Sequence, residues 1–139
     1  MASNNYTLGI DIGSTTAKLA LMCDGKIVYS KYQRHRSRII STTLDMLREM
    51  KEIYPVDKVR VTISGSAGMG MAEKAGIDFI QEVYATGEVV YKLAPDTGVV
   101  IELGGEDAKI IYFEGGNVEQ RMNGICAGGY AGGCRSRIR

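Results

Sequence analysis

Short runs rich in apolar residues open the chain and predict three successive β-strands, at residues 6–12, 17–23 and 27–33. Asp24 and Gly25 separate the second run from the third, and this dipeptide is typical of a tight turn between paired strands. We therefore expect the chain to begin with strands, of which the second and third pair through a hairpin.

The next segment changes to helical spacing. Four apolar residues recur three or four positions apart: Ile40, Leu44, Leu47 and Met50. The pattern predicts a helix over residues 39–54, with Ser37 as its N-cap and Pro55 ending it. A β-rich run follows at residues 59–64, and a strand that returns after a helix is expected to be parallel.

The middle of the chain is less regular. Its expected elements are a glycine-rich bend, a short helix, an edge strand and a longer helix, at residues 65–70, 71–75, 79–80 and 82–93. Pro95 and Asp96 then break the chain. Three further strands are expected, at residues 98–103, 108–113 and 118–122.

The order strand, acid-glycine loop, strand, turn, strand thus occurs twice, which indicates a degenerate internal repeat. We expect an α/β fold with a first lobe at residues 1–95, the start of a second lobe at residues 96–129 and a divergent tail at residues 130–139. The second copy stops before any helix that could cover its sheet, and a sheet with one bare apolar face is unusual. The chain is therefore expected to be the front part of a longer protein, with the tail a truncation or artefact.

Composition narrows the class of protein. The 139 residues are 45% hydrophobic and 24% charged, which is typical of a globular chain, and the net charge of +1 implies no nucleic-acid or membrane-surface partner. No apolar run approaches the roughly 20 residues of a membrane span. Residues 1–5 lack the apolar stretch of a signal peptide, so we expect a cytoplasmic protein.

The three cysteines and the single histidine give little indication of a metal site or a catalytic base. Cys23, Cys126 and Cys134 show no metal-binding pair at short spacing. Cys23 lies in an apolar strand and is expected to be a buried apolar filler. His35 lies in the basic stretch 34–38, which we expect to be a solvated loop and not the place of a catalytic base.

Two glycine loops are the strongest chemical signal. The first follows a predicted strand and contains Asp11, Gly13, Ser14, Thr15 and Thr16, with Lys18 after it. The second follows another strand and contains Glu102, Gly104, Gly105, Asp107 and Lys109. Glycine lets the backbone approach a ligand, successive N–H groups can bind an anion, and a carboxylate can hold hydrated Mg²⁺. We expect the loops to be two halves of one phosphate clamp.

Three stretches together resemble one family. They are residues 9–18 (GIDIGSTTAK), 101–109 (IELGGEDAK) and 122–129 (MNGICAGG). The chain resembles the BadF/BadG/BcrA/BcrD ATPase family, the activators of 2-hydroxyacyl-CoA dehydratases. The resemblance implies an actin-like ATPase (ribonuclease H-like) lobe with a mixed sheet, followed by the first strands of a second, incomplete lobe.

The resemblance also implies roles for the loop residues. Asp11 would organise Mg²⁺, Glu102 would orient the metal or the attacking water, and the other loop residues would bind the phosphates of ATP. Lys18 and Lys109 could meet phosphate as point charges, although each could also be a strand-edge lysine. The family usually has Asp where this chain has Glu102, and often Gln where it has Glu106, so the hydrolysis rate is in question more than nucleotide binding.

The third stretch contains Cys126, which the resemblance implies is a ligand of a [4Fe–4S] cluster shared by a homodimer. The expected function is the ATP-binding and ATP-hydrolysing part of an activator that delivers an electron to a 2-hydroxyacyl-CoA dehydratase. The fragment by itself is expected to be inactive. A sugar or acid kinase of the same superfamily and an actin-like assembly module are the alternatives, and Cys126 favours the activator because neither alternative needs a thiol there.

Overall fold

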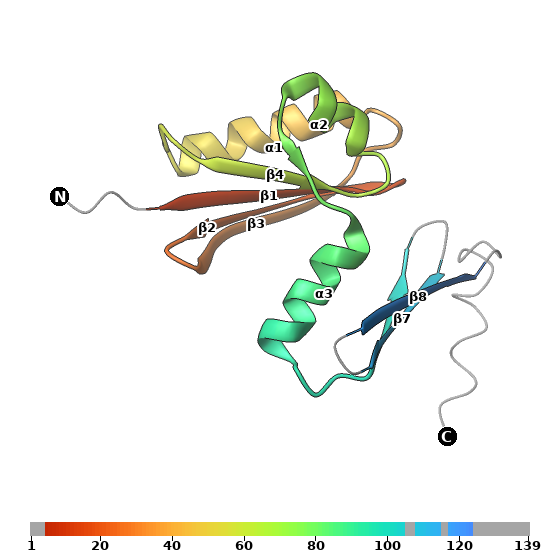
Figure 1. Ribbon diagram of the computed structural model, residues 1–139. Coiled ribbons are helices and arrows are strands. Elements are labelled where there is room, and N and C mark those ends of the chain that lie inside the picture. The colour runs from red at the N-terminus through yellow and green to blue at the C-terminus, as the bar shows by residue number, and fades with distance from the viewer. Residues whose placement is uncertain (1–4, 105–107, 115–116, 124–139) are drawn as a thin grey trace. The chain divides into compact units, whose positions relative to one another are not determined.

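The computed structural model of the protein describes residues 5–104, 108–114 and 117–123. The chain forms two compact units, Met1–Gln81 and Glu82–Arg139, and each is described by itself (Figure 1). No helix among the described residues is both long and apolar enough to span a bilayer.

The first unit contains a five-stranded mixed sheet. Its strands are β1 (Tyr6–Ile12), β2 (Thr16–Cys23), β3 (Lys26–Arg34), β4 (Arg60–Ser64) and β5 (Asp78–Phe79). The order across the sheet is β3-β2-β1-β4-β5, in which β1, β2 and β3 are antiparallel neighbours while β4 runs parallel to β1 and β5 parallel to β4. The three opening strands, the hairpin and the parallel return strand are confirmed.

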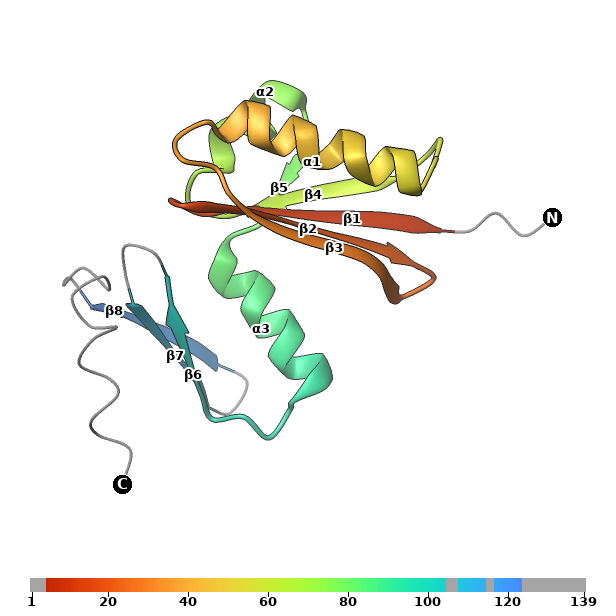
Figure 2. The same ribbon diagram turned by 180° about the vertical axis from the view of Figure 1, so that it is seen from behind.

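Helices α1 (Ile39–Ile53) and α2 (Met69–Ala75) cover the same face of this sheet (Figures 1 and 2). The core between them and the sheet is aliphatic, and β1 supplies Leu8, Ile10 and Ile12 to it. Burying each such side chain contributes roughly 1.5–3 kcal/mol. Because side chains alternate along a strand, Asp11 lies on the opposite face from Ile10 and Ile12. The residues before and after Asp11 in the strand are thus both packed into the core.

Helix α1 differs from the prediction in two respects. Arg38, and not Ser37, is the N-cap, without a side-chain cap bond, because Ser37 lies at a φ of 63° outside the helix. Of the apolar stripe, Met50 is buried, but Ile40 and Leu44 are 65% and 44% exposed. Thr42 and Thr43 take core positions instead, and Thr43 Oγ1 donates to the Ile39 carbonyl, which satisfies its hydroxyl.

The second unit contains helix α3 (Glu82–Leu93) and a three-stranded antiparallel sheet. Its strands are β6 (Val99–Leu103), β7 (Ala108–Glu114) and β8 (Asn117–Asn123), in the order β6-β7-β8. These elements match the expected ones. Contacts group α3 with this unit, whereas the sequence placed residues 82–93 in a first lobe. The division of the complete fold into lobes at 1–95 and 96–129 stays a prediction, and the tail lies outside the described residues.

Candidate functional site

Asp11 lies at the carboxyl end of β1, in a row of three polar side chains that crosses three strands. Its register partners are Lys18 on β2 and Ser64 on β4. Lys18 Nζ donates to Asp11 Oδ2 at 2.5 Å, and Ser64 Oγ donates to Asp11 Oδ1 at 3.3 Å. The Asp11 side chain is still 32% exposed. The carboxylate is therefore oriented by two neighbours and open to a ligand.

Sequence reasoning did not identify Ser64 as a site residue. The signal was present, because residues 59–64 were expected to form a parallel strand. Parallel strands place their carboxyl ends at one edge of a sheet, where ligands bind in open α/β folds. A parallel partner of β1 therefore had to place its last residues beside Asp11.

The loop after Asp11 is closed by a backbone hydrogen bond from Gly13 N to Thr16 O at 2.9 Å. Gly13 and Ser14 are half-buried, Thr15 is exposed and Thr16 is buried at 8% exposure. Thr15 is thus the residue of the loop most open to water. This arrangement is compatible with an anion held by main-chain N–H groups.

The turn between β4 and α2 packs against the same loop. Ala67 N donates to Ile12 O at 2.9 Å, and Gly65 adopts a φ of +96° beside it. A Cβ on Gly65 would lie 2.2 Å from Ile12 O, so only glycine fits at this point. The end of β1 is consequently fixed from the side of β4 as well as from β2.

His35 contradicts the expectation of a solvated loop. It is 3% exposed, and its Nε2 lies 3.0 Å from the carbonyl oxygen of Gly13. Its backbone N–H donates to Thr15 O at 3.2 Å. The basic residues around it suggested solvent exposure, and nothing in the sequence pattern indicated that the ring folds inward onto the first glycine loop.

The second loop is described in part. Glu102 lies near the end of β6 and Gly104 directly follows this strand, while residues 105–107 lie outside the described residues. Glu102 pairs in register with Lys109 on β7, as Asp11 pairs with Lys18. Among the residues that the structure describes, Glu102 Oε2 is buried and has no hydrogen-bond partner. Lys109 is paired with Glu82 at the start of α3. An unpartnered buried carboxylate oxygen fits a cation ligand.

The predicted cluster ligand Cys126 lies outside the described residues, as does Cys134. Cys23 is only partly buried at the end of β2, where its thiol donates to Asp24 Oδ2 at 3.7 Å, so the expectation of a buried apolar filler is wrong. Within the described ranges no group of three or more His, Cys, Asp or Glu side chains could hold a metal ion.

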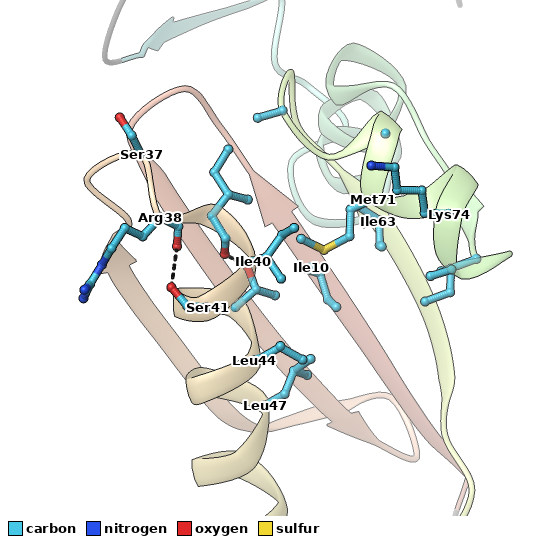
Figure 3. Close-up of a pocket in the computed structure, with 16 residues that line it drawn as sticks. Ile10, Ser37, Arg38, Ile40, Ser41, Leu44, Leu47, Ile63, Met71 and Lys74 are labelled. Carbon is cyan, nitrogen blue, oxygen red and sulfur yellow. Dashed lines mark hydrogen bonds between the residues drawn. The ribbon is translucent and has the colours of Figure 1, made fainter.

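An apolar groove of about 850 Å³ lies between α1 and α2. Leu44 and Leu47 of α1 and Met71 of α2 point into it, and Ile10 and Ile63 line its floor (Figure 3). Because Ile10 and Asp11 lie on opposite faces of β1, this groove is on the other side of the sheet from the Asp11 carboxylate. It is not part of the candidate site.

Comparison with known proteins decides the family. The model of the BadF/BadG/BcrA/BcrD ATPase family matches residues 8–138 of this chain. The chain belongs to this family. Among curated members, it is 31% identical to the (R)-2-hydroxyglutaryl-CoA dehydratase activating ATPase of Acidaminococcus fermentans over 127 residues, which are 89% of this chain and 49% of that protein. It is 30% identical to the activator of lactoyl-CoA dehydratase of Anaerotignum propionicum, with the same coverage.

A solved structure supports the same assignment. The crystal structure of component A of the Acidaminococcus fermentans (R)-2-hydroxyglutaryl-CoA dehydratase matches with a TM-score of 0.61 at 30% identity, over 88% of this chain and 49% of that one. The predicted fold class, an actin-like ATPase lobe with a mixed sheet, is confirmed. The chain spans about half the length of the curated family members that it matches.

Proposed function

We propose that the chain carries the phosphate-binding part of an ATPase that activates a 2-hydroxyacyl-CoA dehydratase by delivering an electron to it. One observation carries the proposal: a half-buried carboxylate, Asp11, stands at the head of a glycine loop whose backbone is fixed by neighbouring segments. The proposal is supported by family membership and by curated relatives named as a dehydratase activator and an activating ATPase.

In the first loop, Asp11 holds Mg²⁺ and the backbone of Gly13, Ser14, Thr15 and Thr16 binds the terminal phosphates of ATP. Asp11 would hold Mg²⁺, which would supply positive charge to offset the negative charge of the phosphates. Lys18 Nζ donates a hydrogen bond to one oxygen of Asp11. Its ammonium group would meet a terminal phosphate as a point charge.

In the second loop, Glu102 orients the metal or the attacking water, while Gly104, Gly105, Asp107 and Lys109 complete the clamp. Glu102 Oε2 is buried and has no hydrogen-bond partner within the described ranges, which supports a ligand role for this side chain. Its carboxylate stands one methylene further from the backbone than that of an Asp. We therefore expect slower hydrolysis more than weaker binding, because positioning is the main source of catalysis in phosphoryl transfer.

In the proposed mechanism, binding of ATP is coupled to the arrangement of two lobes. ATP shifts that arrangement only if it binds one form more tightly than the other. Cys126 is proposed as a ligand of a [4Fe–4S] cluster held between two copies of the protein, and such a cluster would supply the electron for the dehydratase. We propose that the complete protein is cytoplasmic.

The decisive experiment replaces one carboxylate by its amide. Asp11→Asn should weaken binding of Mg-ATP about tenfold or more in a calorimetric titration, which corresponds to about 1.4 kcal/mol or more. The matched control is Asp24→Asn, the same change in the exposed turn between β2 and β3, and it should leave the affinity unchanged. Equal affinities for Asp11→Asn and the unaltered chain would remove the proposed metal site.

An iron and sulfide assay tests the electron-transfer part on the complete reading frame, purified without oxygen. Bound iron that is lost in Cys126→Ser supports the activator. Absence of iron, together with phosphorylation of a sugar or an acid, would replace the proposal by the kinase.

A further inference from the structure

Both ring nitrogens of His35 are engaged, and together they define its tautomer. Ser37 N–H lies 3.2 Å from Nδ1. A backbone N–H can only donate, so Nδ1 is an acceptor and carries no proton. In the neutral ring the proton is then on Nε2, which donates it to the carbonyl oxygen of Gly13 at 3.0 Å. The imidazole is therefore a directed donor to the first glycine loop.

The bond to Gly13 also orients the next amide. In a planar trans peptide the C=O of one residue and the N–H of the following residue point in opposite directions. With its carbonyl held by His35, the Gly13–Ser14 peptide directs the Ser14 N–H away from the imidazole. This N–H has no backbone partner in the part of the chain that the structure describes, so it is available to an anion.

The backbone on either side of the ring reinforces this arrangement. His35 N–H donates to Thr15 O, and the His35 carbonyl accepts a hydrogen bond from Arg38 N at 2.7 Å. Arg36 and Ser37, between them, both adopt left-handed conformations, with φ of 47° and 63°. Such conformations cost free energy in residues other than glycine and persist where the surroundings impose them. Here they bring Ser37 N–H back to Nδ1.

We propose that His35 is a positioning residue of the nucleotide site: it holds the Gly13–Ser14 peptide so that the Ser14 N–H faces the phosphate. This inference rests on the proposed function, in which the first loop binds ATP. His35 does not touch the nucleotide. It acts through the peptide, from the side of the loop opposite the ligand, and its buried ring keeps water from competing for the Gly13 carbonyl.

Two substitutions separate positioning from simple loss of stability. His35→Leu removes the donor and should weaken Mg-ATP binding about five- to tenfold, the effect of one lost hydrogen bond. His35→Gln retains an amide donor near the position of Nε2 and should recover most of the affinity. Met50→Ala is the control, because it opens a cavity under the far end of α1 without touching the loop. It should lower stability and leave the affinity unchanged.

The outcomes distinguish this inference from the proposed function. If the unaltered chain binds Mg-ATP and needs Asp11, but His35→Leu binds as well as the unaltered chain, the positioning role is wrong and the proposed function stands. If the affinity does not depend on Asp11, the proposed function fails first. Should His35→Leu fail to fold, ¹⁵N NMR of the unaltered protein decides: the Nε2-protonated tautomer and a shift of the Ser14 amide on addition of Mg-ATP are expected. The other tautomer would overturn the inference.

Discussion

Gly65 shows how a single backbone position supports the site. Its φ of +96° is unfavourable for any residue with a side chain, and an added Cβ would lie 2.2 Å from Ile12 O. Gly65→Ala should therefore destabilise the protein by about 3 kcal/mol or more, from the combined cost of overpacking and a left-handed backbone. A urea denaturation curve measures this loss directly.

The matched control lies five residues further along the chain. Gly70 is in helix α2, and a Cβ there meets nothing within 4 Å. Gly70→Ala should stabilise the protein by about 0.5–1 kcal/mol, because alanine loses less backbone entropy in a helix. A similar loss of stability in both variants would show that the close contact of Gly65 with Ile12 is not what makes the turn between β4 and α2 sensitive to substitution.

At the scale of elements, an ion pair joins helix α3 to strand β7. None of its residues is buried. Its first residue, Glu82, is paired with Lys109 of β7, and the two side chains are only 22% and 11% exposed. A carboxylate at a helix N-terminus is also favoured by the helix dipole. Glu82→Gln should therefore cost about 2 kcal/mol, less than the loss of a fully buried pair, and should speed hydrogen exchange along α3.

Glu88→Gln is the corresponding change in the same helix. Glu88 pairs with Lys92 one turn away, and both side chains are more than half exposed. The expected change in stability is within about 0.5 kcal/mol. If exchange along α3 rises equally in both variants, the helix is held by something other than the pair with Lys109.

The elements were predictable from the sequence because their signals are local. Turn residues separate the strands, and helical spacing located residues 39–54. The face of α1 that is buried was not predictable, because Ile40 and Leu44 fit a core stripe as well as Met50 does. Only the packing of α2 leaves those two beside an open groove. His35 escaped prediction for a related reason: its burial depends on a turn of two left-handed residues within a basic stretch.

At the scale of the whole molecule, the two units carry the same arrangement of an acid, a glycine and a lysine. In each unit the second-to-last residue of a strand is an acid, and a glycine lies two positions after it. The acid pairs in register with a lysine of the next strand. The two lysines differ in their partners, because Lys18 is paired with Asp11 and Lys109 with Glu82. The candidate acids and glycines were found from sequence because both copies carry them. The shared clamp remains a prediction, since it depends on how the two units approach each other around a ligand.

The clamp makes a prediction that neither loop makes alone. In a Mg-ATP titration followed by amide NMR, the signals of Gly13 and Gly104 should shift together with one midpoint, in the high-micromolar range or weaker. The affinity should be low because two loops and their carboxylates alone offer few contacts to the nucleotide. Asp11→Asn should weaken both responses, although it alters only the first loop, because one ligand would connect the two. A shift of Gly13 at saturation while Gly104 stays still would mean that the first loop binds the phosphates without the second.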